Sequence, residues 1–435
     1  WVWRGEVWLK RTMGGDGDGH PDGEPKRKEK LEGFAFWESI GRPKFVLAPM
    51  VDQSELAFRM MTRKHGVNLT YTPMLHSRLF VENPKKYKKE NYESDPADKP
   101  CFVQFCGDDP ETLLAAAKMA EKDFDAVDIN LGCPQNIAKR GHYGAFLLEE
   151  NDLLRRIVST LHDGLSCPVT CKIRKVNSHN FQDTLNLAYD LQAAGCSVIC
   201  LHGRTKEEKG HHTRIADWEA IKILKGRMDI PVIANGGVET YDDAIKCLEQ
   251  TGVDAIMSAE GLLENPALFS GNTVSVDDLA AEYITFAEKY PPVQKGAVKS
   301  HLFRMLHPKL QVHTDLRAKL GKSHSFAEYK AVADEMRSRT MGPHHSQTGW
   351  YRRYRKNEPP RSGSRPTDHS SVPVSHAGAS AAEQPQGRAE ATEEEEGGEE
   401  EEGGDVSTVE RESKRRCPDP NPCLAQRGEA WAAEG

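Results

Sequence analysis

The sequence predicts an α/β protein: a (β/α)8 TIM barrel followed by a small all-helical domain and a disordered C-terminal tail. Three observations lead to this fold class. Between residues 31 and 270, eight short apolar runs alternate with segments of helical periodicity. The runs are apolar almost throughout, as parallel strands buried on both faces should be. All eight fit within about 225 residues, which favours a closed barrel over an open sheet.

The predicted strands and helices follow one another regularly along the chain. The strands are Lys44–Ala48, Leu69–Tyr71, Cys101–Phe105, Ala126–Asn130, Val169–Ile173, Val198–Leu201, Val232–Ala234 and Ala255–Met257. The helices between them are Glu55–His65, Pro110–Lys122, Asn151–His162, Gln182–Ala194, Trp218–Leu224 and Tyr241–Thr251. After Leu75 the first half of the segment fits a helix, but Pro84 and the lysine cluster at 85–89 break the pattern.

Composition divides the rest of the chain. Residues 1–30 are expected to be a disordered N-terminal segment, and residues 31–270 form the barrel. Residues 271–340 read as a helical domain, in which Pro308 forces a break or a new start. Residues 341–435 are rich in Pro, Gly, Ser, Glu and Arg and are expected to be a disordered tail. This tail contains the basic cluster Arg352-Arg353-Tyr354-Arg355-Lys356, which suits RNA binding or nuclear localisation.

The formal net charge of −8 comes from a single segment. Residues 393–402 hold eight Glu, so the remaining chain is neutral and a polyanionic partner is not excluded. No apolar run approaches the ~20 residues of a membrane helix, and WVWRGEVWLKRTMGG lacks the apolar core of a secretory signal. Ten cysteines, without a zinc-type spacing, fit a reduced compartment. We therefore expect a cytoplasmic or nuclear location, no membrane and no metal.

Polar residues gather where the predicted strands end. Because the carboxyl ends of barrel strands meet at one rim, where such barrels carry their active sites, these residues are expected to lie together. Five strand ends with hydrogen-bonding or cationic groups argue against a purely structural explanation. The residues are Gln104, Asn130, Cys133, Lys172, Arg174, His202, Arg204 and Asn235.

The residue types at this rim suit FMN. Backbone N–H groups of Asn235-Gly236-Gly237, after the seventh strand, can approach a phosphate, although such turns can also be tight loops without a ligand. Lys172 can stabilise an electron-rich ring, and Gln104 can bind a polar ring edge. Pro49-Met50-Val51 offers an apolar wall for the ring.

Cys133 differs from the other cysteines because it lies in a loop, between Gly132 and Pro134. An ordinary thiol pKa of ~8.5 leaves such a group mostly protonated at neutral pH, so it can act as an acid. The alternative is a buried loop thiol without a catalytic role. His202 and Arg204 could contact the ring, the phosphate or a polyanionic substrate.

Seven motifs in this order resemble the tRNA-dihydrouridine synthases. The resemblance runs from about residue 33 to about residue 335, and the stretch Gly-His-Tyr-Gly-Ala-Phe-Leu is similar to the eukaryotic branch acting on positions 16 and 17 of the tRNA D-loop. The motifs are Ala-Pro-Met-Val-Asp (48–52), Val-Gln-Phe (103–105), Asp-Ile-Asn-Leu-Gly-Cys-Pro-Gln (128–135), Lys-Arg-Gly-His-Tyr-Gly-Ala-Phe-Leu (139–147), Cys-Lys-Ile-Arg (171–174), Leu-His-Gly-Arg-Thr (201–205) and Ala-Asn-Gly-Gly (234–237).

The resemblance implies a mechanism and a set of site residues. NADPH or NADH would reduce bound FMN, a hydride would pass to uracil C6, and Cys133 would protonate C5. Asn130, Arg174 and Arg204 are expected to contact the substrate. A Glu stands at 260 where many relatives have Arg beside the phosphate, so Ala259 is expected to contribute through its N–H. The implied FMN contacts are Pro49, Met50, Val51, Gln104, Lys172, His202, Asn235, Gly236, Gly237, Ala259 and Glu260.

A basic segment follows the barrel. From Lys295 to Lys356 there are 14 Lys and Arg against 4 Asp and Glu, a net charge of +10. This predicts that the helical domain grips tRNA phosphates; the alternative is a solvated helix face with a basic tail. Two rival functions stay open: an FMN barrel oxidoreductase acting on a small molecule, and a non-catalytic tRNA-binding relative. The oligomeric state is left open, and a monomer is compatible with the sequence.

Overall fold

The computed structural model describes residues 30–294 and 296–340, and the statements below concern these residues. The predicted N-terminal segment up to residue 29 lies outside them. So do Lys295 and the predicted tail from residue 341, with its basic cluster and its Glu run. Expectations for those segments stay predictions.

Eight parallel strands form a nearly closed barrel, as predicted. Neighbouring strands of the barrel follow the order β1-β9-β8-β7-β6-β5-β4-β2. An isolated bridge between Val46 of β1 and Leu69, directly before β2, joins the two ends of this order. A short extra strand, β3, pairs with β4. The bounds are β1 Phe45–Leu47, β2 Thr70–Tyr71, β3 Leu75–His76, β4 Cys101–Cys106, β5 Ala126–Leu131, β6 Val169–Arg174, β7 Cys196–His202, β8 Val232–Asn235 and β9 Ala255–Ser258.

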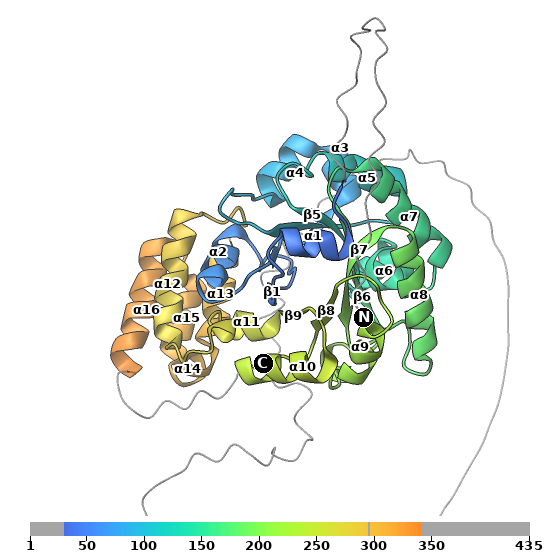
Figure 1. Cartoon of the computed structure of the whole chain (residues 1–435). Coiled ribbons are helices and arrows are strands. Elements are labelled where there is room, and N and C mark those ends of the chain that lie inside the picture. Colours follow the sequence, from blue (N-terminus) through green and yellow to red (C-terminus); the bar gives the residue numbers. More distant parts are fainter. Residues whose placement is uncertain (1–29, 295, 341–435) are drawn as a thin grey trace, which may run out of the picture. The chain divides into compact units, whose positions relative to one another are not determined.

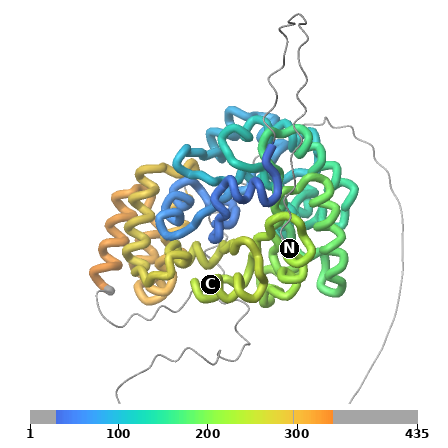
Figure 2. The backbone as a smooth tube through the Cα atoms, in the orientation of Figure 1, coloured from blue at the N-terminus to red at the C-terminus, as the bar shows by residue number. Residues whose placement is uncertain are grey.

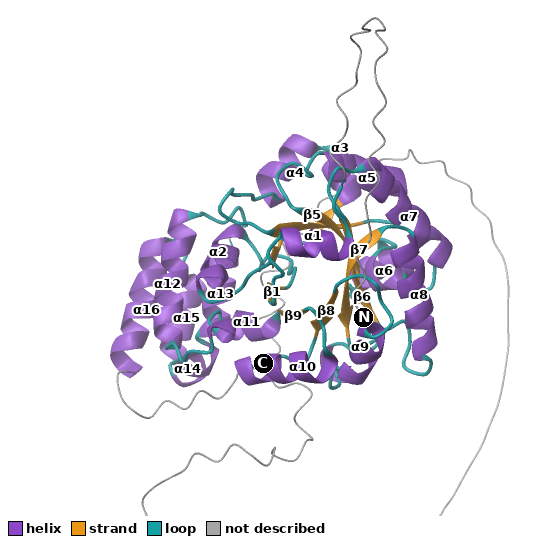
Figure 3. Ribbon diagram, in the orientation of Figure 1, coloured by secondary structure: helices purple, strands orange, loops and turns teal. Residues whose placement is uncertain are grey.

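Helices surround the strands on the outside of the barrel, which Figure 3 shows as purple ribbons around orange arrows. Six of them were predicted from periodicity and differ from the prediction by a few residues at their ends. The barrel helices are α2 Leu56–Lys64, α5 Pro110–Lys118, α7 Asn151–Gly164, α8 Phe181–Ala193, α9 Trp218–Lys225, α10 Tyr241–Thr251 and α11 Glu260–Glu264.

Local sequence signals explain where these helices begin and end. The Asp109 side chain accepts the N–H of Thr112, and Pro110 occupies the first turn of α5. Helix α10 begins with a capping box formed by Thr240 and Asp243. It ends at Gly252, whose left-handed φ of 66° favours glycine.

One helix covers the barrel near the amino-terminal ends of the strands. Helix α1 (Gly33–Ser39), which the sequence did not indicate, inserts Phe36 and Trp37 into the apolar interior. The ring of Phe36 stacks on Phe102 of β4, with centroids 5.8 Å apart. Figure 1 shows α1 lying across the strands. The interior is therefore a packed core, not a channel.

The segment after β3 forms two helices where the pattern predicted an interruption. Pro84 ends α3 (Ser77–Glu82) and begins α4 (Pro84–Asn91). The Asn83 side chain accepts the N–H of Lys86 at the start of α4. Pro is tolerated at this first helical position because its missing N–H would have had no partner, so the lysine cluster is helical.

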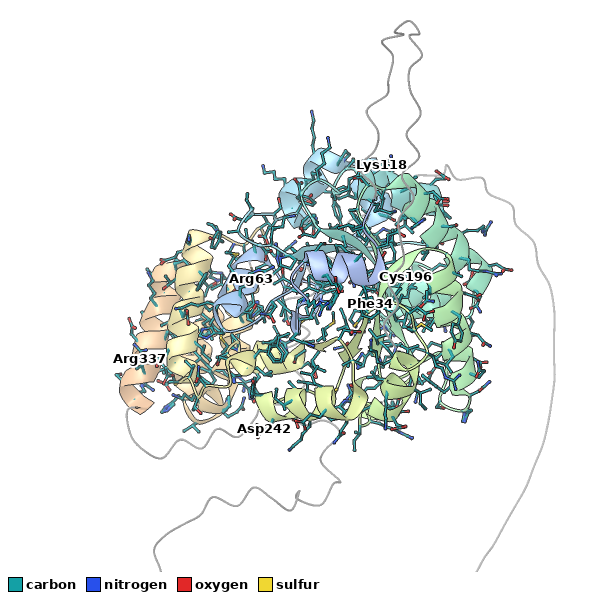
Figure 4. The ribbon with its side chains drawn as sticks, in the orientation of Figure 1. Phe34, Arg63, Lys118, Cys196, Asp242 and Arg337 are labelled. Carbon is teal, nitrogen blue, oxygen red and sulfur yellow. The ribbon has the colours of Figure 1, made fainter. Side chains whose placement is uncertain are left out.

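The helical domain consists of α12 Val276–Lys289, α13 Ala297–Met305, α14 His307–Val312, α15 Thr314–Lys322 and α16 Phe326–Thr340. Pro308 lies in the first turn of α14, so it starts a new helix. Helix α12 packs against α2 of the barrel and against α16, and Figure 2 shows this part of the chain in yellow and orange. In Figure 4, Arg337 marks α16, and Cys196 marks the start of β7.

A buried polar cluster joins the helical domain to the barrel. Tyr283 Oη donates to Glu55 Oε1 at 2.7 Å, and His301 Nε2 lies 3.0 Å from Glu55 Oε2. The His301 ring also stacks on Phe58, with centroids 4.2 Å apart. Burial by itself raises the pKa of Glu55, but His301 and Tyr283 outweigh it and hold the pKa below the ordinary value. The two domains therefore share a common core.

A buried ion pair holds the chain before β4. Arg59 Nε donates to Asp98 Oδ2 at 2.6 Å, and the two side chains are 0 % and 2 % exposed. The remaining Arg59 nitrogens donate to the carbonyls of Ser54 and Glu93. Burial alone raises the pKa of Asp98, but Arg59 and Arg63 hold it below the ordinary value.

We predict that Arg59→Met lowers the free energy of unfolding by about 3–5 kcal/mol, because Asp98 and two carbonyls lose their donor in a buried place. Urea denaturation measures this loss. The control is Arg42→Met, which removes an exposed pair with Glu38 and should cost about 0–1 kcal/mol. Equal losses in the two variants would contradict the assignment.

Candidate active site

The carboxyl ends of the strands form a mouth lined by partly exposed residues. The strands behind them are buried, so these residues mark the part of the barrel open to a ligand. Val51, at 47 % exposed, and Glu260 lie at its outer edge. The partly exposed residues are Pro49, Met50, Asn130, Cys133, Lys172, His202, Gly236, Gly237 and Ala259.

A chain of side-chain amides connects β4 to the loop after β5. Asn130 Oδ1 accepts the N–H groups of Gly132 at 3.2 Å and Cys133 at 2.9 Å. Asn130 Nδ2 donates to Gln104 Oε1 at 2.8 Å, and Gln104 Nε2 donates to Asp128 Oδ2 at 2.8 Å. Gln104 is fully buried, and each of its two polar atoms already has one protein partner.

Asp128 ends this chain inside the barrel wall. It is fully buried, and its Oδ1 accepts from Thr170 Oγ1 at 2.6 Å. Burial raises the pKa of Asp128 to about 7, although the bonds from Thr170 and Gln104 favour the ionised form. No pattern in the sequence predicted a role for this residue. Its signal was a charged residue in the middle of the apolar run Ala126–Leu131.

Cys133 is the only partly exposed cysteine among the described residues; the others are buried. The cysteines within the strands are therefore core thiols. Burial raises the pKa of the Cys133 thiol above its ordinary value, against the opposing influence of Arg174 and Lys172. The group is therefore a thiol at neutral pH and can donate a proton.

Several groups fix the loop that carries Cys133. Its carbonyl accepts the N–H of Ala145 at 3.1 Å, and Arg174 Nε donates to the carbonyl of Gly132 at 2.7 Å. Gly144 lies directly against Cys133 with a left-handed φ of 70°. A Cβ at this position would lie 2.7 Å from the Cys133 carbonyl oxygen, so the contact requires glycine.

Lys172 and Asn235 meet across the mouth. Lys172 Nζ donates to Asn235 Oδ1 at 2.9 Å, and Asn235 Nδ2 donates to the carbonyl of Met257 at 3.1 Å. Burial lowers the pKa of Lys172. Burial, together with the charge of Arg204, lowers the pKa of Arg174 to about 10. Cations thus gather on one side of the mouth and suit an anionic ligand.

His202 is a neutral imidazole in this setting. Burial, with the charges of Arg174, Lys172 and Arg204, holds its pKa well below the ordinary value. Arg204 Nη1 lies 3.0 Å from His202 Nε2. Since a guanidinium can only donate, Nε2 must accept, which places the histidine proton on Nδ1. Arg204 Nε also donates to the carbonyl of Arg214, at 2.5 Å.

The turn after β8 has the backbone that the glycine pair predicts. Gly236 and Gly237 have φ values of 101° and 79°, a conformation that favours glycine. Trp218 Nε1 donates to the carbonyl of Gly236 at 3.0 Å. Glu260 begins the short helix α11 with an exposed side chain.

The structure brings the predicted site residues to one rim, but it buries some of them. Arg174 and Arg204 are 9 % and 7 % exposed. Arg174 Nη1 donates to the carbonyl of Thr205 at 2.8 Å, in addition to its bond with Gly132. Both arginines thus hold loops in place, and their contact with a substrate stays a prediction.

Charges on the helical domain are largely paired. Of the 14 basic residues counted between Lys295 and Lys356, nine lie in the described part, and five of these form ion pairs there. In contrast, four cations near the mouth form no ion pair with another described residue. They are Lys139, Arg140, Lys209 and Arg214. Lys209 Nζ instead reaches the carbonyl of Pro134, next to Cys133.

No cluster of three or more His, Cys, Asp or Glu suited to a metal ion occurs within residues 30–294 and 296–340. In the same ranges, no helix has the length and apolar character needed to cross a membrane.

Comparison with known proteins agrees with this geometry. A family described as dihydrouridine synthase (Dus) matches residues 46–345. A Mus musculus protein named tRNA-dihydrouridine(16/17) synthase NAD(P)(+)-like is 48 % identical over 71 % of this chain, which spans 65 % of that protein. A Saccharomyces cerevisiae tRNA-dihydrouridine(16/17) synthase is 43 % identical over 71 % of this chain and 76 % of its own length.

A third relative has a different named specificity. The Homo sapiens tRNA-dihydrouridine(20a/20b) synthase-like protein is 36 % identical over 57 % of this chain and 76 % of its own length. The family match covers the barrel and the helical domain together, including the loop that carries Cys133. The chain therefore belongs to the dihydrouridine synthase family.

Proposed function

We propose that this protein is an FMN-dependent tRNA-dihydrouridine synthase that reduces the C5–C6 double bond of uridines 16 and 17 in the D-loop with NADPH or NADH. The observation that carries the proposal is the partly exposed Cys133 thiol, whose pKa burial raises, at a cationic barrel mouth. Membership of the family supports the reaction class. The names of the mouse and yeast relatives support the positions and the reductant.

The lining of the mouth fits FMN. Pro49 and Met50 provide an apolar wall, and the turn at Gly236 and Gly237 brings backbone close to the mouth. Lys172 supplies positive charge beside these groups. The exposed side chain of Glu260 can turn to solvent, so its carboxylate does not oppose a phosphate near Ala259. The apolar wall suits the flavin ring of FMN, and the cation and the glycine turn suit its phosphate.

Bound FMN, once reduced by NADPH or NADH, would supply a hydride to one carbon of the uracil double bond, C6. The residues of this chain provide the proton and the geometry. Cys133 Sγ–H donates its proton to the neighbouring carbon, C5. Asn130 holds the backbone of Cys133 in place, and the neutral His202 adds no further charge to a mouth that already contains three cations. The uridine must leave its stack to reach this site, which costs a few kcal/mol and least in a loop.

The tRNA backbone would contact cations at the rim and on the helical domain. Lys139 and Arg140 are exposed at the end of α6 (Asn136–Arg140), a few residues after Cys133. Arg214 is exposed on the loop after β7. On the helical domain, Arg317 and Lys322 are exposed and form no ion pair with another described residue. Such cations can neutralise phosphates around the flipped base.

Replacing the acid tests the reaction itself. We expect Cys133→Ala to retain FMN absorbance but to form dihydrouridine about 10²- to 10⁴-fold more slowly, the usual effect of losing a general acid. The measurement is dihydrouridine at positions 16, 17 and 20 of unmodified tRNA incubated with NADPH. Cys247→Ala, at a buried cysteine of α10, is the control and should behave as wild type. Full activity of Cys133→Ala would refute the assigned role.

Moving the loop should have a similar effect without touching the thiol. Gly144→Ala places a Cβ 2.7 Å from the Cys133 carbonyl oxygen, so we expect about a 10²-fold loss of kcat, with FMN still bound. Gly252→Ala is the matched control, because Gly252 has a similar φ of 66° but no atom within 4 Å of the added Cβ. It should lower stability by about 1–2 kcal/mol and leave kcat intact. Similar kcat values in both variants would contradict this role of Gly144.

Salt dependence tests the RNA contact. Phosphate contacts make the logarithm of the tRNA association constant fall linearly with the logarithm of salt concentration. The double variant Lys139→Ala, Arg140→Ala should reduce this slope by about one unit per cation. The control is Lys222→Ala, Lys225→Ala on α9, whose lysines pair with Glu219 and Asp254. An unchanged slope in the rim variant would remove Lys139 and Arg140 from the tRNA surface.

A further inference from the structure

We propose that Asp128 is a positioning residue for this site: it is the terminal acceptor of a hydrogen-bond chain, through Gln104 and Asn130, that orients the Gln104 amide and holds the loop of Cys133. We call these three side chains the amide relay. The meaning of its orientation for FMN rests on the proposed function, whereas its effect on Cys133 follows from the fold alone.

The direction of the amide relay is set at the Cys133 loop. The N–H groups of Gly132 and Cys133 can only donate, so the Asn130 atom that faces them must be the oxygen. The Asn130 NH2 group then faces Gln104 and must donate to its oxygen. The Gln104 NH2 group is consequently turned toward Asp128. A flip of the Gln104 amide would break two bonds, and a flip of the Asn130 amide would break three.

The other end of the relay requires an acceptor. Gln104 Nε2 donates to Asp128 Oδ2, so that oxygen must offer a lone pair to the amide. The Thr170 hydroxyl can rotate. It can donate to Asp128 Oδ1 when the carboxylate is ionised, or accept from Oδ1 when the carboxyl is protonated. An ionised carboxylate is the stronger acceptor, because charge-assisted hydrogen bonds are roughly twice as strong as neutral ones. Asp128 therefore holds Gln104 best when ionised.

Burying this carboxylate is costly, so packing does not explain it. Asp128 is fully buried and forms no ion pair with a described residue, since the nearby Lys172 donates to Asn235. An apolar residue would fill the same place in the strand at lower cost. What an apolar residue could not provide is an acceptor for Gln104. This points to orientation of the amide as the reason for a carboxylate here.

The relay leaves Gln104 with one N–H and one oxygen lone pair, each on a fixed side. Flavin rings present carbonyl oxygens and an N–H along one edge, and that pattern matches a Gln amide in one orientation only. Without the Asp128 carboxylate, the Gln104 amide could turn, and its buried Nε2 would lose its hydrogen-bond acceptor. At the loop, it would loosen the bond of Asn130 to the Cys133 N–H.

Burial raises the pKa of Asp128 to about 7, so its charge changes around neutral pH. The phenol and thiols around it, on Tyr71, Cys171 and Cys200, have pKa values raised above the ordinary ones. Burial lowers the pKa of Lys172, the nearby cation, and the pKa of His202 is already well below the ordinary value. FMN affinity should therefore weaken as the pH falls through about 7.

The test compares Asp128→Leu, which removes the acceptor, with Asp128→Asn, which keeps an oxygen but removes the charge. FMN dissociation constants are measured by quenching of flavin fluorescence between pH 6 and pH 8. We expect Asp128→Leu to bind FMN about 10- to 100-fold more weakly, the cost of an orphaned buried donor. Asp128→Asn should lose the affinity step near pH 7, while any step from the FMN phosphate, with pKa near 6, remains.

Thr170→Val sharpens the test without touching the relay. Its hydroxyl lowers the pKa of Asp128, so its removal should move the affinity step to higher pH. Thr251→Val, another buried hydroxyl that donates to Cys247, is the matched control and should keep the wild-type step. An unshifted step in Thr170→Val, or a step that persists in Asp128→Asn, would overturn the proposal.

A second readout needs neither FMN nor activity. Iodoacetamide alkylation of Cys133 in the apoprotein, followed by mass spectrometry of its peptide, should be about 10-fold faster in Asp128→Leu, because the loop is released and the thiol is less buried. An unchanged rate would refute the role of Asp128 at the loop. If wild-type protein binds no FMN and forms no dihydrouridine, the proposed function fails, and this rate still decides the relay. If Asp128→Leu does not fold, the pH profiles of Asp128→Asn and Thr170→Val decide it.

Discussion

Parallel pairing of the first strand with the last is the interaction on which the site depends. Leu47 lies opposite Ser258, and the N–H of Ala48 donates to the Ser258 carbonyl at 3.0 Å. This pairing, with the bridge from Val46 to Leu69, bends the sheet into a ring. The segment after β1, which begins at Pro49, thus lies next to the segment after β9, which begins at Ala259. Without it, the apolar wall and the glycine turn would lie at distant edges of an open sheet.

The helical domain is attached to the same loop that forms this wall. Gln53 Nε2 donates to Ser300 Oγ at 2.9 Å, and Glu55 binds both His301 and Tyr283 in a buried cluster. The loop between Met50 and Glu55 is therefore held from the barrel on one side and from α13 on the other. A ligand that displaces α13 would break these bonds to the loop.

Charge is distributed unevenly over the described surface. Pairs such as Lys309–Asp277 and Lys330–Glu288 neutralise much of the helical domain. Four cations near the mouth, Lys139, Arg140, Lys209 and Arg214, form no ion pair with another described residue, and Lys209 reaches the carbonyl of Pro134 next to Cys133. A net charge summed along the chain does not distinguish these cases. Which cations remain available for phosphates depends on which carboxylates the fold places beside them.

The sequence by itself determined the barrel, its eight strands, the position of Cys133 and the rim residues. It could do so because burial on both faces leaves continuous apolar runs, and because parallel strands bring their ends to one rim. It missed α1, the second helix at Pro84 and the role of Asp128. Only the tertiary structure decided that Arg174 holds a loop, that His202 is neutral and that Gln104 points one way. These properties depend on distances between residues far apart in the chain, which no local pattern records.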